Sequence, residues 1–185
     1  MTLTMMVAEQ VQSSEGTRVR ELFGTLGRRR ESRNGVAVLE LRQPGALSEN
    51  DLAALHKLLT PLAERIFRGD WSRHFEGERQ RRTFKKRRRF YVVVSETDHV
   101  VGWSGYYAKH VGRDTLLYFD IAAVDADHRS SGVFGDIYGR AIAQEWTHRP
   151  WNRMWVVGFT QNPVVYAMQL HTLGRDNVYP KAVKR

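Results

Sequence analysis

The spacing of apolar residues along the chain predicts strands separated by helices and short polar turns. Clusters of β-branched and aromatic residues are typical of strands, and they occur over residues 35–41, 90–95, 100–111, 115–124 and 154–160. The second, third and fourth of these clusters are joined by short polar turns, which favours an antiparallel meander.

Helical periodicity indicates three helices. Ser48 and Asp51 form a capping box, and apolar residues then recur at helical spacing up to the next loop. We expect Pro61 to break or restart this helix, because proline removes a backbone donor. Further helices are predicted over 133–146 and 163–173. The order β, α, β, β, β, α, β, α predicts an α/β (α+β) fold, with a mixed, mostly antiparallel central sheet and helices on both faces.

Length and composition favour a single domain. The chain has 185 residues, of which 42% are hydrophobic, enough for one core. We expect the polar residues 1–34 to form a partly ordered extension before one domain over 35–185. The absence of cysteine excludes disulfides and agrees with a reducing, cytoplasmic location. No run of about 18 apolar residues occurs, so the sequence predicts no membrane span.

Most of the net charge lies in one short segment. The formal net charge is +9, yet residues 1–78 are balanced and residues 90–185 carry only +1. The remaining +8 lies in residues 79–89, the basic run, which has no acidic residue. Such a run can attract polyanions, in particular nucleic acid, with an affinity that falls as salt rises. The alternative is that the run is only a solvated helix end or loop.

Residues 118–135 combine a strand end, a short loop of small residues and the start of a helix. The first amides of a helix have no partner within it and point outward at the positive end of the helix dipole. A strand, loop and helix in this order can therefore hold a diphosphate. The turn alone also explains Gly132, so both interpretations remain open.

This segment resembles the cofactor-binding motif of the GNAT superfamily of N-acetyltransferases. In that family a β-meander leads to an Arg/Gln-x-x-Gly-x-Gly/Ala loop that holds the pyrophosphate of acetyl-coenzyme A (acetyl-CoA). Arg129, Gly132 and Phe134 stand at the three motif positions. The resemblance covers residues 90–175 by pattern and 35–175 by element order. It implies a GNAT-like fold and an acyl-CoA, in the simplest case acetyl-CoA, as co-substrate, without a metal.

The resemblance also assigns binding roles. The backbone of Ala122, Ala123 and Val124 would pair with the pantetheine arm and the thioester carbonyl, and Asn162 would lie near the pantetheine. The pyrophosphate would be held by the loop and the first helical turn, which comprise Arg129, Ser130, Ser131, Gly132, Val133 and Phe134.

Three features depart from the family pattern. Phe134 replaces a small residue that lets the diphosphate approach the backbone. Leu170 stands where many members have the tyrosine that protonates the leaving thiolate. Tyr166 lies one turn earlier on the same helical face, and it either reaches the sulfur or only packs. Beyond the last predicted helix the fold usually has one or two more strands. We expect a missing strand, a short one over 178–184, or one supplied by a partner in a homodimer.

Acyl transfer to an amine needs a base, an oxyanion donor and a proton source for the thiolate. A backbone N–H near Val124 is the candidate oxyanion donor. Asp120, Glu40 and His110 are the candidate bases. Asp120 stands out because an unpaired carboxylate within an apolar run is costly, although a solvated strand edge would also explain it. The histidines elsewhere lack ligand spacing, so the sequence predicts no metal site.

The leading hypothesis is therefore an acyl-CoA-dependent N-acyltransferase. The basic run disfavours a polycationic acceptor and favours an acidic or nucleic-acid-linked one. Two alternatives remain. One is a nucleic-acid-binding protein that uses the basic run, which includes a tRNA-directed GNAT toxin. The other is a GNAT-like protein without catalytic activity, suggested by Phe134 and Leu170.

Overall fold

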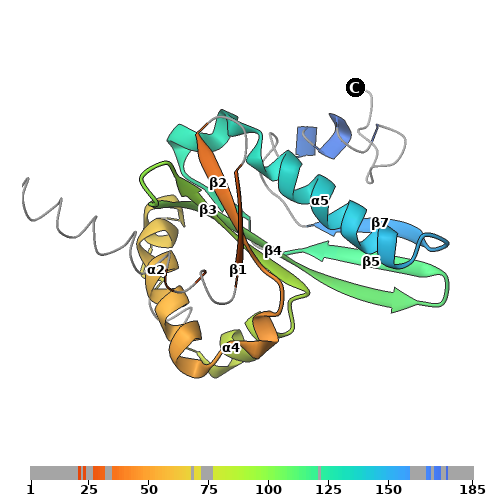
Figure 1. Cartoon of the computed structure of the whole chain (residues 1–185), viewed down its shortest axis with the longest axis horizontal. Helices are drawn as coiled ribbons and strands as arrows, with labels where there is room; N and C mark the ends of the chain where they lie inside the picture. Colours follow the sequence, from red (N-terminus) through yellow and green to blue (C-terminus); the bar gives the residue numbers. More distant parts are fainter. Residues whose placement is uncertain are drawn as a thin grey trace, which may run out of the picture.

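A twisted, mostly antiparallel sheet forms the centre of the protein, as the computed structural model in Figure 1 shows. The structure describes residues 27–31, 35–67, 69–71, 77–120 and 122–158, together with the separate positions 21, 23, 166, 167, 169–171 and 174. The seven strands are β1 (Gly27–Glu31), β2 (Val36–Leu41), β3 (Arg89–Ser95), β4 (Val100–Val111), β5 (Asp114–Phe119), β6 (Ala123–Val124) and β7 (Arg153–Gly158).

The strand order is β1-β2-β3-β4-β5-β7, and β6 pairs with β4. All neighbouring strands are antiparallel except β5 and β7, which are parallel. Helix α5 (Val133–His148) connects this parallel pair, as a parallel crossover requires. The mixed, mostly antiparallel sheet that the sequence predicts is therefore confirmed.

Two helices, α2 (Glu49–Phe67) and α4 (Glu78–Lys85), follow β2. Ser48 caps the helix as predicted, because the Asp51 amide donates to the Ser48 hydroxyl at 3.1 Å. The Asp51 carboxylate accepts from that hydroxyl at 2.6 Å rather than from the Ser48 amide, so only the N-cap half of the predicted capping box forms. The prediction that Pro61 interrupts the helix is wrong. Pro61 and the residue four positions earlier, Lys57, are both exposed, so water can solvate the carbonyl that proline leaves unpaired.

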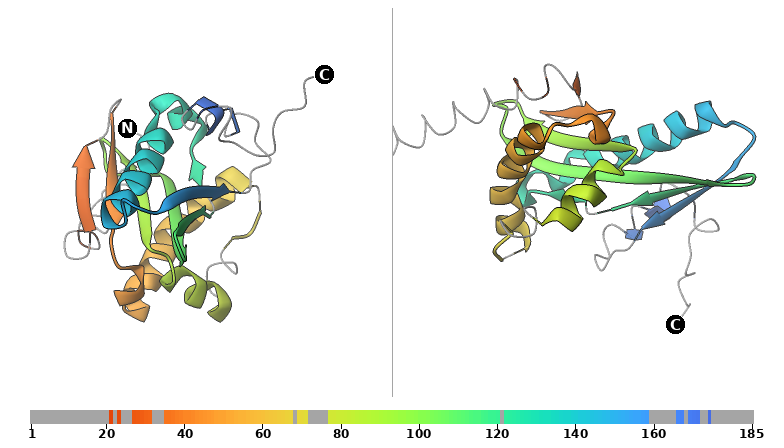
Figure 2. Two further views of the ribbon diagram at one scale, coloured as in Figure 1. Left: turned by 90° about the vertical axis from the view of Figure 1, so that its right-hand side faces the viewer. Right: turned by 90° about the horizontal axis from the view of Figure 1, so that it is seen from below.

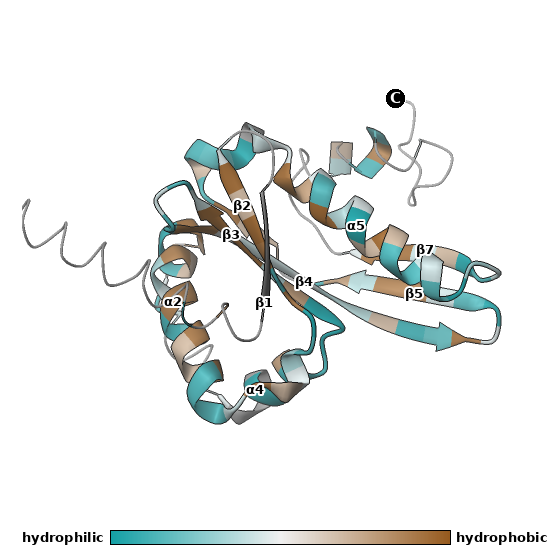
Figure 3. Cartoon of the chain, in the orientation of Figure 1, coloured by the Kyte–Doolittle hydropathy of each residue, from teal (hydrophilic) through white to brown (hydrophobic). Residues whose placement is uncertain are grey.

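Helices cover both faces of the sheet, as Figure 2 shows. One apolar core lies between the sheet and α2 and includes Leu55, Leu59 and Trp103. The other lies between the sheet and α5 and includes Tyr106, Phe119 and Ile137. Strands β2 and β3 contribute to both cores, and Figure 3 shows apolar residues over much of their length.

Two parts of the sheet differ from the predictions. Residues 27–31 form β1 within the extension 1–34, so the sheet begins earlier than expected. The strand predicted over 115–124 is divided into β5 and β6. Within the predicted helix 163–173, positions 166, 167 and 169–171 are helical and the others lie outside the described residues. None of the helices described is both long and apolar enough to cross a membrane.

Candidate active site

The register between β4 and its partner strand shifts by one residue where β5 ends and β6 begins. Tyr106 of β4 pairs with Phe119, whereas Trp103 of β4 pairs with Ala123, so one extra residue lies between the two ladders. The parallel pairing of β7 with β5 ends at Gly158, opposite Phe119. Within the part of the chain that is described, the side of β6 that faces away from β4 has no strand partner. Its backbone groups can therefore pair with an extended ligand.

A left-handed glycine joins the loop to α5. A 3-10 helix, Ala126–Ser131, ends at Gly132, whose φ of 72° favours glycine. A Cβ at Gly132 or at Gly135 would meet no atom within 4 Å, so the space beside both residues is open. The first intrahelical hydrogen bond runs from the Asp136 amide to the Gly132 carbonyl at 3.2 Å. The amides just before it have no helical acceptor and can bind an anion.

The side chains around this turn leave the binding to the backbone. Val133 is buried, and Phe134 packs against the same core, so the core accommodates the large residue at the third motif position. The Ser131 hydroxyl is buried and accepts a long hydrogen bond of 3.5 Å from the Val133 amide. Ser130 is described by its backbone alone, within the 3-10 helix. Arg129 is exposed and is the one cation in the predicted motif.

Strand β6 also offers backbone rather than side chains. The side chains of Ala123 and Val124 point into the two cores, and Ala122 is half-buried. Strand β4 approaches β6 closely because Gly102 lacks a side chain. A Cβ at Gly102 would lie 2.8 Å from the carbonyl oxygen of Ala123.

Asp120 lies at the end of β5, where the register changes. Its amide donates to the Gly105 carbonyl at 3.1 Å, which fixes its backbone. The Oδ2 atom of its carboxylate accepts hydrogen bonds from the Arg87 guanidinium and, at 3.4 Å, from the Tyr107 hydroxyl. The side chain is only 20% exposed. Asp120 is therefore ion-paired and partly buried, and the solvated edge position does not describe it.

Aromatic rings hold Arg87 in place. Its guanidinium carbon lies 4.9 Å, 5.8 Å and 5.4 Å from the ring centroids of Phe84, Phe90 and Tyr107. Burial raises the pKa of Tyr107 to about 12, so its hydroxyl stays protonated at neutral pH and can donate to Asp120. Two donors therefore fix the Asp120 carboxylate from one side.

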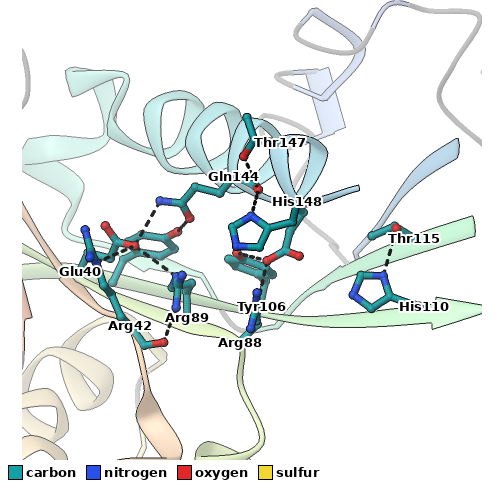
Figure 4. Close-up of polar contacts among 12 residues, drawn as sticks. Glu40, Arg42, Arg88, Arg89, Tyr106, His110, Thr115, Gln144, Thr147 and His148 are labelled. Atoms are coloured by element: carbon teal, nitrogen blue, oxygen red, sulfur yellow. Dashed lines mark hydrogen bonds and ion pairs between the residues drawn. The ribbon is translucent and has the colours of Figure 1, made fainter. Parts of the chain in front are cut away.

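Glu40, the second candidate base, lies on the opposite face of the sheet, beneath α5 (Figure 4). Its side chain is 3% exposed and its Oε1 atom accepts a hydrogen bond from Gln144 at 3.2 Å. The Arg89 Nε atom lies 3.3 Å from the same oxygen. The structure thus does not bring Glu40 and Asp120 together, and Asp120 is the carboxylate next to β6.

The basic run is largely ion-paired. Its partners come from α2, β2, α5 and the end of β5, and the pairs are Lys85 and Arg81 with Glu49, Arg87 with Asp120, Arg88 with Glu145, and Arg89 with Glu40. Glu145 is buried, and its Oε1 atom accepts hydrogen bonds from Arg88 at 2.9 Å and Tyr106 at 3.0 Å. The run has no acidic residue of its own, but five of its eight cations pair with four carboxylates from elsewhere in the fold. The structure therefore balances part of the +8 charge that the sequence places there.

Of the other predicted residues, those that the structure describes make no hydrogen bond to the Asp120 carboxylate, and the rest lie outside the described residues. Tyr166 is helical and half-buried. His110 is exposed near the end of β4, and its Nδ1 atom lies 3.1 Å from the Thr115 hydroxyl. Asn162 and the segment 178–184 are outside the described residues. Among the residues that are described, no three histidine, cysteine, aspartate or glutamate side chains are grouped as metal ligands.

Comparison with known proteins gives matches at the level of structure. No protein-family model and no curated protein sequence matches the chain. The aminoglycoside antibiotic 6'-N-acetyltransferase AAC(6')-Ih from Acinetobacter baumannii is similar with a TM-score of 0.52 and 13% identity, over 82% of this chain and 98% of that chain. The chain has the GNAT fold.

Two further acetyltransferase structures agree with the GNAT fold. The aminoglycoside acetyltransferase HMB0005 from an uncultured soil metagenomic sample gives a TM-score of 0.51 at 16% identity, over 82% of this chain and 96% of that one. The ribosomal-protein-alanine N-acetyltransferase from Brucella melitensis biovar Abortus 2308 gives 0.50 at 13% identity, over 81% and 98%. At these identities the likeness concerns the arrangement of the elements.

Sequence reasoning missed Arg87 and Tyr107, which complete the surroundings of Asp120 in this GNAT fold. The cost of an unpaired carboxylate signals that Asp120 needs a partner. The sequence does not indicate which of eight neighbouring cations in the basic run supplies it. Only the packing of Arg87 on the aromatic rings selects one.

Proposed function

We propose that this protein is an acyl-CoA-dependent N-acetyltransferase. The observation that carries the proposal is the direct succession of an unpartnered β6 edge and an open, left-handed turn at the start of α5. The β6 edge can pair with an extended arm that contains amides, and the turn can bind a diphosphate. The GNAT fold, which the three acetyltransferases above share, supports the same reading.

The residues present fit acetyl-CoA. Amides at the start of α5 and the exposed Arg129 would hold the diphosphate, with open space beside Gly132 for close approach. The backbone from Ala122 to Val124 would pair with the pantetheine arm. The resemblance adds Asn162 as a further contact to that arm.

The chemistry requires few groups. When bound, acetyl-CoA supplies the acyl group as a thioester. A neutral acceptor amine would attack the thioester carbonyl, forming a C–N bond and breaking the C–S bond. A backbone N–H of β6 near Val124 would donate to the oxyanion, and Tyr166 is the proposed donor of the proton that the thiolate takes up.

Asp120 is the proposed base. Its Oδ2 atom is engaged by Arg87 and Tyr107, whereas its Oδ1 atom accepts no hydrogen bond from any residue the structure describes. That second oxygen would accept the proton that the attacking amine loses, directly or through one water. Because Arg87 and Tyr107 fix the carboxylate, the amine would meet a base of set orientation.

The acceptor is proposed as a primary amine. The preference for an acidic or nucleic-acid-linked acceptor rests on the charge of the basic run, and ion pairs with Glu49, Asp120, Glu145 and Glu40 reduce that charge. A panel of an aminoglycoside, a peptide with an N-terminal alanine and an aminoacyl-tRNA would separate the acceptor classes. Release of free CoA thiol with each acceptor is the readout.

Calorimetry with acetyl-CoA tests the binding site. The wild-type protein should bind, and Gly132→Glu should not, because it places a carboxylate in the proposed diphosphate site. Gly132→Ala shares the backbone strain without the charge and should still bind. Gly139→Glu adds the same charge to an open position of α5 and should also bind. No heat with folded wild-type protein, or normal binding by Gly132→Glu, would overturn the proposal.

A kinetic variant tests the base. Asp120→Asn should bind acetyl-CoA normally and lose at least about a hundredfold in turnover. An unchanged turnover number would remove Asp120 from the mechanism while leaving the binding site intact.

A further inference from the structure

The end of the molecule formed by the β4–β5 turn and the α5–β7 connection carries exposed cations and aromatic rings. We call this end the distal tip and define it as residues 109–115 and 146–155. Backbone and side chains join its two segments, because the Arg153 amide donates to the Arg113 carbonyl at 2.8 Å and the Asn152 side chain donates to Thr115 at 3.0 Å. Figures 1 and 2 show the two turns side by side.

The distal tip is positively charged. It contains Lys109, Arg113, Arg149 and Arg153 against one carboxylate, Asp114, a net charge of +3. Arg153 pairs with Asp114 through two hydrogen bonds of 2.9 Å and 3.0 Å. The other three cations are exposed, and none has an ion-pair partner within the described structure. In the basic run, by contrast, five of the eight cations are paired with carboxylates.

The distal tip also exposes large apolar side chains. Trp151 is 86% exposed at the α5–β7 connection, and Trp146 on α5 is 55% exposed. Val111 and Trp155, on β4 and β7, are about half exposed. Trp151, the most exposed of the four, lies between Arg149 and Arg153 in the sequence, and an aromatic ring so exposed beside cations is typical of a contact with a partner.

We infer that the distal tip binds single-stranded nucleic acid, with Trp151 as a stacking platform and Arg113 and Arg149 on phosphates. Unpaired bases stack on exposed aromatic rings, and guanidinium groups pair with phosphate oxygens. The apolar side chains alternate with Thr147, His148 and other polar groups, which a bilayer would have to desolvate. This mixture of apolar and polar groups favours a hydrated polyanion with planar bases, such as single-stranded nucleic acid, over a membrane.

This inference does not depend on the proposed function. Helix α5 has 16 residues, so the distal tip lies about 24 Å from the Gly132 turn at its other end. Variants of the distal tip should therefore leave acetyl-CoA binding unchanged, and Gly132→Glu should leave nucleic-acid binding unchanged.

Fluorescence anisotropy with a labelled oligouridine of about 15 nucleotides tests the inference. Trp151→Ala should weaken binding about tenfold, and Trp151→Tyr, which keeps a ring, should restore most of it. Arg113→Gln combined with Arg149→Gln should reduce the slope of log affinity against log salt by about 1.4, since each phosphate contact contributes about 0.7 for a single strand. A matching oligothymidine distinguishes RNA from DNA as the source of the strand.

The control removes the same charge elsewhere. Lys57→Gln combined with Lys86→Gln neutralises two exposed cations, one on α2 and one in the basic run, and should change affinity less than about twofold. Three results would overturn the inference: no oligonucleotide binding by the wild-type protein, an unchanged affinity in Trp151→Ala, or a larger loss in the control than in the distal-tip pair. Binding to phosphatidylserine vesicles or polyglutamate but not to oligonucleotides would also overturn it, in favour of another partner.

Discussion

Replacing Arg87 by methionine removes the cation that faces Asp120 and keeps an unbranched side chain. The two side chains are 11% and 20% exposed. This places the pair between an exposed ion pair, which contributes about 0.2–1 kcal/mol, and a buried pair, whose disruption costs about 3–5 kcal/mol. We expect about 2 kcal/mol from the pair. Loss of the guanidinium–ring contacts adds about 0.5–1 kcal/mol, so the free energy of unfolding should fall by about 3 kcal/mol in total.

A double-mutant cycle isolates the pair. Urea unfolding of the wild type, Arg87→Met, Asp120→Asn and the double variant should give a coupling energy of about 2 kcal/mol. The matched control is the pair of Arg65 and Asp125, which lie 2.5 Å apart but with Arg65 57% exposed. Its coupling should stay below about 1 kcal/mol. Equal coupling energies in the two cycles would refute the reasoning, because burial would then have no effect on the strength of the ion pair.

Three other perturbations follow from the structure. Gly102→Ala should lower the free energy of unfolding by about 1–3 kcal/mol and weaken acetyl-CoA binding, because the added methyl group would displace β6. Gly139→Ala, at an open helical position, should instead raise the free energy of unfolding by about 0.5–1 kcal/mol, and calorimetric unfolding measures both changes. Lys85 beside Glu49 holds the pKa of that carboxyl below its ordinary value, so this pair stabilises the folded state at neutral pH and loses its effect as the pH falls through the folded pKa. In Glu49→Gln the melting temperature should therefore depend less on pH below about pH 5. Burial raises the pKa of four tyrosines, namely Tyr91, Tyr106, Tyr107 and Tyr138. Their neutral forms stabilise the fold below about pH 10 and this stability is lost as the pH rises, so tyrosinate absorbance should increase together with the loss of circular dichroism; a rise of four tyrosines in a still-folded protein would contradict it.

Periodicity predicted most of the fold because each strand and helix carries its own apolar pattern. The meander, the capped helix α2 and helix α5 follow from residues close together in the sequence. The division of β5 from β6 does not, because one extra residue in a ladder leaves the local alternation of apolar residues nearly unchanged. Strand β1 was missed because Arg28, Arg29 and Arg30 have no apolar pattern, and only their pairing with β2 makes this segment a strand.

The sequence by itself determined the order of the main strands and helices, the total charge and the glycine turn at the start of α5, all of which follow from local properties of the chain. Only the tertiary structure decided which of the cations form ion pairs. Residues far apart in sequence, such as Arg88 and Glu145, pair with one another and balance part of the basic run, whereas Arg113 and Arg149 have no ion-pair partner among the residues described. Ion pairs depend on distances of a few ångströms in space, and the chain sets those distances only when the sheet and helices pack together.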